Sequence, residues 1–203
     1  MIRIGVAGSG SGSNFQAILD AIEEDGLPVE VVCVISDHAD AGILVKARRA
    51  GIPAHHVNPA PYRTKLDGEA ERLAIRMFQE AGAECIVLAG FMLMIKSGLL
   101  RAFPNRVLNI HPSLLPAFPG LEAWKQAVDY GAKVSGCTVH FVDEGMDTGP
   151  IIVQKAVPVL PGDTPGDLHA RILEQEHIAY PEALRWLAEG RLTLDGRRVQ
   201  TPG

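Results

Sequence analysis

The second half of the chain carries three polar residues whose side chains together suit acyl transfer. Asn109 supplies an amide donor, His111 a titratable imidazole and Asp147 a carboxylate. An amide can stabilise the oxyanion of a tetrahedral intermediate, and an imidazole beside a carboxylate can move a proton. On spacing alone His111 has two interpretations, a catalytic group or an ordinary capped surface residue. We therefore treat the three as candidate catalytic residues.

A glycine-rich run at residues 8–14 lies between the first apolar stretch and a helical pattern. Its backbone N–H groups and the helix dipole would make a phosphate site, and glycine lets the chain come close to the ligand. Ser13 and Asn14 can cap the helix or donate to the ligand. The alternative interpretation is a tight strand-to-helix turn with no ligand.

The remaining histidines and the cysteines give no sign of a metal site or of a disulfide framework. No two histidines have helical four-residue spacing beside a carboxylate or a CxxC pair, so we predict no metal. The three cysteines are odd in number and lie in apolar, strand-like runs, so we expect buried thiols. The cysteines are Cys33, Cys85 and Cys137, and the histidines without an obvious partner are His38, His55, His56, His169 and His177. His140 lies on a strand whose facing the pattern leaves open.

Composition limits the class of protein. The chain has 203 residues, 47% of them hydrophobic, which suits one compact domain. A formal net charge of −5 provides no basic field for nucleic acid or an anionic membrane. The N-terminus lacks the pattern of a secretory signal, and no window has the eighteen or so apolar residues of a membrane span. We expect a cytoplasmic protein.

In the first half, short apolar runs alternate with helical patterns, which is typical of βαβ units. Gly26, Gly51 and Gly82 follow three of the predicted helices, where C-caps are needed. We predict strands at residues 2–7, 29–36, 54–57, 85–89 and 106–110, and helices at 14–24, 41–50, 64–82 and 97–103.

In the second half the pattern changes. A helix near residues 121–131 precedes two long strands, 133–142 and 151–159, joined by the loop 143–150. A helical stretch follows at 164–190, in which Pro181 should cause a kink or a division. Residues 191–199 predict a hairpin that turns at Asp195–Gly196.

These patterns predict an α/β fold with a Rossmann-like, mostly parallel twisted sheet, helices on both faces, and antiparallel strands added to the same sheet by the C-terminal half. We expect residues 1–203 to form one domain, with a phosphate-binding half (about 1–105) and a catalytic half (about 106–203). Ligands of such sheets bind where loops leave the carboxyl ends of strands. The loops at residues 8–14, 89–92, 109–116 and 143–150 fall there, and we predict that they converge on one crevice.

The same segments resemble the folate-dependent formyltransferase family over essentially the whole chain. The motif LNIHPSLLP (108–116) is the most specific of them. The others are GSGSN (10–14), LAGFM (88–92), PG (119–120), TVHFV (138–142), MDTGP (146–150) and QEH (175–177).

The resemblance implies transfer of the formyl group of 10-formyltetrahydrofolate, as co-substrate, to the amine of glycinamide ribonucleotide in purine (IMP) synthesis. It implies catalysis by direct attack, with Asn109 and His111 stabilising the oxyanion and Asp147 assisting proton transfer. It implies ribonucleotide contacts from Gly12, Ser13, Asn14 and Glu176. It implies folate contacts from Lys65, Met92, Leu93, Met94, Ile95, Asn109, Glu144, Gly145 and Asp147.

The chain departs from the family pattern at one position. The family commonly carries Arg after Phe-Met, and this chain has Leu93. A charge that could meet the glutamate tail of folate is absent there, which leaves Lys65 or backbone N–H groups for that contact. The resemblance also favours a cis bond between Leu115 and Pro116.

Several rival functions remain at this point. Methionyl-tRNA formyltransferase and formyltetrahydrofolate deformylase resemble the same core with an added domain. A nicotinamide-binding module would use Asp37 for the ribose, although the glycine pattern has Ser13 in place of the third glycine. A non-catalytic folate-binding protein would lack the three polar residues. We expect small-molecule substrates only, no nucleic acid or membrane partner, and a monomer or homodimer.

Overall fold

The computed structural model describes residues 1–202, and the chain divides into two compact units. The first unit ends at Asn109 and the second begins at Ile110. This boundary falls inside one strand, β5 (Val107–His111). The predicted single domain with two functional halves stays a prediction.

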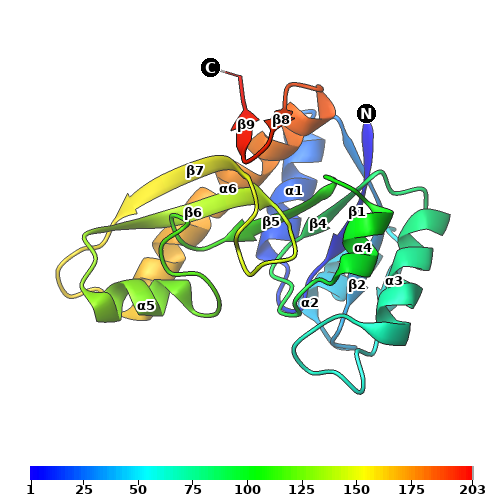
Figure 1. Ribbon diagram of the computed structural model, residues 1–203, viewed down its shortest axis with the longest axis horizontal. Helices are drawn as coiled ribbons and strands as arrows, with labels where there is room; N and C mark the ends of the chain where they lie inside the picture. Colours follow the sequence, from blue (N-terminus) through cyan, green and yellow to red (C-terminus); the bar gives the residue numbers. More distant parts are fainter. Residues whose placement is uncertain (203) are drawn as a thin grey trace. The chain divides into compact units, whose positions relative to one another are not determined.

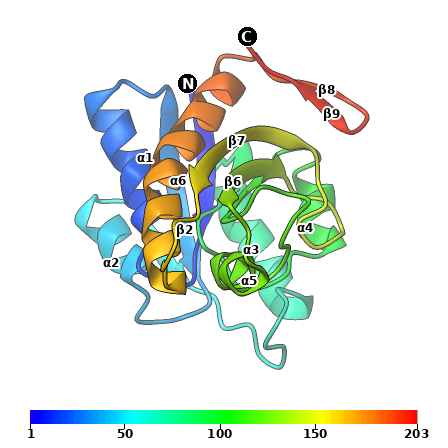
Figure 2. The same cartoon turned by 90° about the vertical axis from the view of Figure 1, so that its left-hand side faces the viewer.

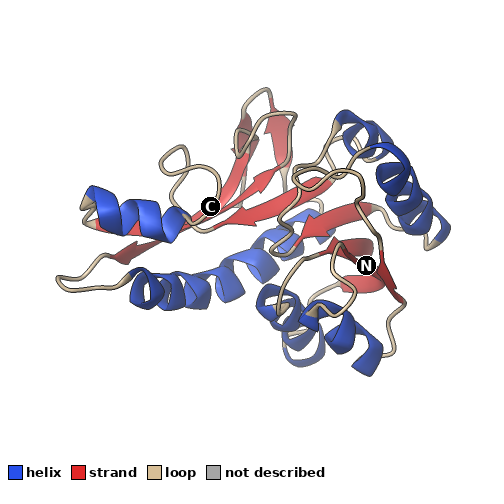
Figure 3. Ribbon diagram, turned by 90° about the horizontal axis from the view of Figure 1, so that it is seen from below, coloured by secondary structure: helices blue, strands red, loops and turns tan. Residues whose placement is uncertain are grey.

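The first unit alternates strands and helices as the sequence pattern predicted. Figures 2 and 3 show helices on both sides of its strands. All of its strand pairs are parallel, with β1 between β2 and β4, β3 beside β2, and β5 beside β4. The elements are β1 (Ile2–Ala7), α1 (Ser13–Glu24), β2 (Val29–Ser36), α2 (Gly42–Arg49), β3 (Ala54–His56), α3 (Gly68–Glu80), β4 (Cys85–Leu88), α4 (Ser97–Ala102) and β5.

The strand order reverses between β1 and β4 (Figure 1), because the chain runs outward from β1 to β3 and then returns to β4. Crevices form at such reversals, outside the carboxyl ends of the strands. The loops that follow β1 and β4 therefore start side by side. Their hydrogen bonds confirm it, since Ser9 N–H donates to Gly90 O at 3.0 Å and Met92 N–H donates to Ser9 Oγ at 2.9 Å.

The second unit carries the antiparallel part of the sheet. Its strands β6 and β7 are antiparallel, and the strand order of the sheet is β3-β2-β1-β4-β5-β6-β7. Helix α6 packs against both long strands and also contacts α5. The predicted fold class is confirmed. The elements are α5 (Ala123–Tyr130), β6 (Val134–Phe141), β7 (Ile151–Pro158), α6 (Pro165–Ala188), β8 (Thr193–Asp195) and β9 (Arg198–Gln200).

Apolar periodicity explains the core of each unit. In the first unit every residue of β4 is buried, as expected for a parallel strand covered on both faces. In the second unit α6 buries one face, including Ile172, Tyr180 and Leu184. The cysteines are buried as predicted, and burial raises the pKa of the Cys85 thiol to about 12, so that it stays protonated.

Three local predictions differ from the structure. Helix α3 begins at Gly68 rather than residue 64, because residues 64–66 bond to Met94 and Asp67 caps the helix by accepting from Gly68 N–H. Helix α6 continues through Pro181 without the division that was one of the two predicted outcomes, and a kink there stays a prediction. The terminal hairpin pairs Asp195 with Arg198, so its turn lies one residue later than predicted.

No helix within residues 1–202 has the length and apolar character needed to cross a membrane. The bond between Leu115 and Pro116 is cis, as the resemblance predicted.

Candidate active site

His111 and Asp147 form a largely buried pair in the second unit. Nδ1 of His111 lies 3.4 Å from Oδ2 of Asp147, and their side chains are 5% and 13% exposed. His111 ends β5, and Asp147 lies in the loop between β6 and β7. The sequence analysis named both residues, and the structure brings them together.

The other ring nitrogen of His111 has a fixed partner. Nε2 lies 2.8 Å from the carbonyl oxygen of Phe118, which can only accept, so Nε2 carries the proton of this hydrogen bond. The contact sets the orientation of the ring and leaves Nδ1 as the nitrogen that faces Asp147. Nδ1 is therefore the nitrogen available for chemistry.

Asp147 is held by a residue close to Phe118 in the sequence. Gly120 N–H donates to its Oδ2 at 2.8 Å, and the residue has a left-handed backbone with φ 54°. Asp adopts this conformation more readily than most residues because its short side chain can bond locally. Two backbone groups, Phe118 O and Gly120 N–H, thus orient the two halves of the pair.

A second histidine approaches Asp147 from strand β6. Nε2 of His140 lies 3.8 Å from Oδ1 of Asp147, and Nδ1 donates to Phe141 O at 2.8 Å. Burial lowers the pKa of His140, while the bond to Phe141 and the charge of Asp147 act in the opposite direction. His140 therefore faces Asp147, which the strand pattern alone left open.

Asn109 precedes His111 by two residues on β5, so the two side chains leave the same side of the strand. Its backbone lies opposite Leu88 in the parallel pairing of β4 and β5. A rigid strand thus sets the spacing of the amide from the imidazole. The sequence analysis extended this strand only to residue 110, and the structure carries it to His111.

The glycine-rich loop of the first unit ends at Gly12, which caps α1 with a left-handed φ of 73°. No side chain caps the helix, and the N-terminus of a helix is a common binding site for phosphate. A Cβ at Gly12 would lie 2.9 Å from Cα of Ile43 in α2, so the position needs glycine for packing as well as for φ. Ser13 is half-buried and Asn14 is buried at 7% exposure. Their phosphate contacts stay a prediction.

The segment after β4 alternates in exposure. The side chain of Met92 is 56% exposed, Met94 is half-buried, and Leu93 and Ile95 are buried in the core. Leu93 and Ile95 can therefore offer a ligand only their backbone. The folate contacts of the segment stay a prediction.

Lys65 lies beside Met94 through a parallel bridge. Its Nζ donates to Asp67 Oδ2 at 2.6 Å and lies 4.3 Å above the ring centroid of Tyr62. The bond to Asp67 raises the pKa of Lys65, so the side chain is cationic but already paired. Its contact with the folate tail stays a prediction.

The remaining predicted residues lie in the second unit. Glu144 and Gly145 are exposed in the loop between β6 and β7, where Asp143 accepts from Gly145 N–H at 3.0 Å and shapes the turn. Glu176 is buried on the face of α6. Burial raises the pKa of Cys137 on β6, and the charge of Glu176 adds to this effect. Its contact with the sugar stays a prediction.

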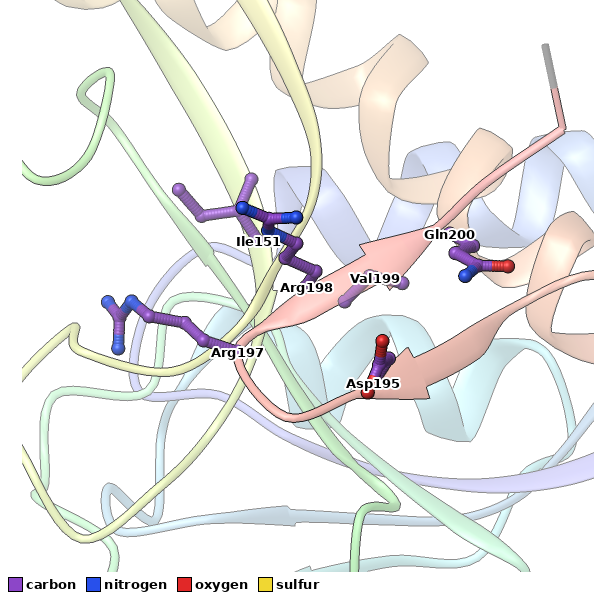
Figure 4. A pocket seen from close by; sticks show the side chains of 6 residues that line it. All are labelled: Ile151, Asp195, Arg197, Arg198, Val199 and Gln200. Carbon is purple, nitrogen blue, oxygen red and sulfur yellow. The ribbon is translucent and has the colours of Figure 1, made fainter.

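The described part of the chain offers no metal-binding cluster, and a hollow on its surface is not lined by the predicted site residues. Within residues 1–202 no group of three or more His, Cys, Asp or Glu side chains is arranged to hold a metal ion. A hollow on the terminal hairpin (Figure 4) is lined by none of the predicted site residues. Its lining is Ile151, Asp195, Arg197, Arg198, Val199 and Gln200. We therefore place the candidate site by its chemistry, at His111 and Asp147.

Sequence analysis missed the residues that hold the catalytic segment. Thr138 Oγ1 donates to Ser113 O at 2.7 Å and accepts from Leu115 N–H at 3.0 Å. Gln154 Nε2 donates to Leu115 O at 3.0 Å. A single polar residue on a strand gives no sequence signal for such a role.

The chain matches the family model described as formyl transferase over residues 2–184. Phosphoribosylglycinamide formyltransferase of Escherichia coli (strain K12) is 40% identical over 96% of this chain and 94% of that protein. A trifunctional purine biosynthetic protein adenosine-3 of Drosophila pseudoobscura pseudoobscura is 47% identical over 94% of this chain, which spans only 14% of its length. The crystal structure of glycinamide ribonucleotide transformylase 1 from Symbiobacterium toebii has a TM-score of 0.95 and 56% identity, with 100% of this chain and 95% of that chain covered. This chain belongs to the formyl transferase family.

Proposed function

We propose that this protein transfers the formyl group of 10-formyltetrahydrofolate to the amine of glycinamide ribonucleotide in purine synthesis. The observation that carries the proposal is the buried pair of His111 and Asp147, with Asn109 on the same strand, in a formyl transferase chain. Relatives that align over nearly their whole length carry this activity in their names. The other activities of the trifunctional relatives are not proposed.

The chemistry needs a donor for a developing oxyanion and a route for one proton. The neutral amine attacks the formyl carbon, a C–N bond forms, and negative charge develops on the formyl oxygen. Asn109 donates to that oxygen through its side-chain amide. His111 donates to it through Nδ1, because Nε2 is engaged by Phe118 O.

Asp147 completes the proton path. Collapse of the tetrahedral intermediate breaks the bond from the formyl carbon to N10 of the folate, and the proton lost by the amine goes to N10. Asp147 lies beside Nδ1 of His111, where its oxygens relay the proton directly or through water. No bond to the protein forms in this scheme.

The first unit offers surface for both ligands. The α1 N-terminus behind Gly12 suits a phosphate monoester, and Met92 and Met94 offer apolar surface to a folate ring. A cytoplasmic location and a monomeric or homodimeric state are also part of the proposal.

An absorbance assay tests the function. A 10-formyl folate and glycinamide ribonucleotide should give deformylated folate and formylated ribonucleotide in equal amounts. Omitting the ribonucleotide should stop the reaction. Deformylation that proceeds without ribonucleotide and releases formate would instead indicate a hydrolase, and transfer only to a charged tRNA would indicate a different acceptor.

A further inference from the structure

The 118–122 loop, formed by Phe118, Pro119, Gly120, Leu121 and Glu122, has an unusual backbone. Phe118, Gly120 and Glu122 have φ values of 51°, 82° and 53°. Residues other than glycine rarely adopt this left-handed region, because Cβ crowds the backbone. Local preference therefore does not hold this loop in place, and contacts from outside it must do so.

Gln126, the fourth residue of α5, contacts this loop from outside it. Its side-chain Nε2 donates to Pro119 O at 3.0 Å and to Leu121 O at 2.9 Å. Its backbone N–H also bonds to Glu122 O at 3.0 Å. One residue thus binds three carbonyl groups of the loop, and two of them flank Gly120.

The loop in turn orients the catalytic pair. Phe118 O accepts from Nε2 of His111 at 2.8 Å, and Gly120 N–H donates to Oδ2 of Asp147 at 2.8 Å. Pro119, whose carbonyl Gln126 binds, lies between these two groups. A shift of the loop would therefore rotate the imidazole and move the carboxylate together.

We propose that Gln126 is a positioning residue for the pair of His111 and Asp147, acting through the 118–122 loop. The expected effect on turnover rests on the proposed function, whereas the expected effect on the His111 ring does not. Gln126 has no role in binding or proton transfer in this scheme. Its two amide N–H donors fix two carbonyls, and these fix the loop that holds both catalytic side chains.

Gln126→Met tests the proposal, because Met keeps the length and helix propensity of Gln and removes both donors. Turnover should fall by about 10- to 100-fold, the usual effect of losing a group that orients an active-site side chain. KM for both substrates should stay within about twofold, since the interaction matters in the transition state. Lys125→Met, at the neighbouring exposed position of the same helix, is the matched control and should keep parental turnover.

A second measurement reads the histidine directly. In ¹⁵N NMR spectra the ring signals of His111, identified by their loss in His111→Gln, should shift in Gln126→Met and not in Lys125→Met. Gln126→Glu has the shape of Gln without N–H donors and should reproduce both changes. If the parent fails to formylate the ribonucleotide, the proposed function is wrong. The ring signals still test whether Gln126 positions His111. Unshifted His111 signals in folded Gln126→Met, whatever its turnover, would overturn the proposal.

Discussion

Nδ1 of His111 faces Oδ2 of Asp147 at 3.4 Å, while Nε2 of the same ring is bonded to Phe118 O. Both nitrogens therefore face oxygen acceptors, and both can donate only when the ring is an imidazolium. The 3.4 Å separation is longer than a closed charge-assisted hydrogen bond of about 2.7–2.9 Å. Asp147 therefore lies on the Nδ1 side of the ring and Phe118 O on the Nε2 side.

Asp147→Asn should keep the fold and ligand binding and lower turnover by about 10²- to 10⁴-fold, the usual effect of a positioned acid–base group. The amide can still accept from Gly120 N–H, so the loop stays in place. Asp129→Asn, an exposed residue on α5, serves as the control. Steady-state kinetics would contradict the role if the variant turned over within about threefold of the parent, which is roughly 0.6 kcal/mol of barrier.

Asn109→Ala should lower turnover by about 10²- to 10³-fold with little change in substrate affinity, because the amide is needed only when the oxyanion forms. The backbone pairing with Leu88 does not depend on the side chain. Substrate titration and thermal melting of the purified variant separate the possibilities. An unstable variant with near-parental specific activity would mean that Asn109 only supports the local fold.

The sequence predicted the fold well because the relevant forces are local. Apolar periodicity predicted the exact bounds of β1 and β2. The alternation of strands and helices predicted that the strands of the first half pair in parallel. The predictions were wrong where a residue distant in the sequence determines the local structure. Residues 64–66 continue a helical pattern, but they pair with Met94, so α3 begins only after the Asp67 cap.

The candidate site was predictable only in its chemical groups. The chemical groups of His111 and Asp147 made them candidates. The sequence around either residue does not show that Phe118 O and Gly120 N–H orient them. His140 illustrates the same limit. The pairing of β6 with β7 shifts register between Val139 and His140, and strand alternation alone does not predict such a shift.

The buried His140 should make folding sensitive to mild acid. Burial lowers the pKa of the folded imidazole below its usual 6.5, so below about that pH the unfolded chain binds a proton that the folded chain does not. This contribution to the free energy of unfolding is present above pH 6.5 and is lost as the pH falls through the folded pKa.

Denaturant unfolding at pH 7 and at pH 5 checks this. Between these two pH values the free energy of unfolding should fall less in His140→Gln than in the parent protein. Burial also lowers the pKa of His169, so both proteins should carry His169→Gln to isolate the effect of His140. Identical losses in the two proteins would mean that His140 titrates normally in the folded state.

The glycine-rich loop separates the proposed function from the nicotinamide-binding alternative, because each assigns the loop a different ligand. One phosphate monoester needs only a few N–H groups and the start of α1, whereas a pyrophosphate needs a third small residue where this chain has Ser13. Glycinamide ribonucleotide should therefore raise the melting temperature by linkage, and NADH at the same concentration should not.

Gly12→Val should abolish the shift caused by the ribonucleotide. A β-branched residue resists the left-handed φ of 73°, and its Cβ would press on Ile43, 2.9 Å away, which displaces the loop from α2. Binding of a 10-formyl folate should survive, since Met92 and Met94 follow β4. Gly166→Ala, whose Cβ would meet only Thr164 Oγ1 at 3.7 Å, is the matched glycine control and should respond like the parent. Saturable NADH binding that Gly12→Val removes, with no response to the ribonucleotide in the parent, would contradict the proposed function.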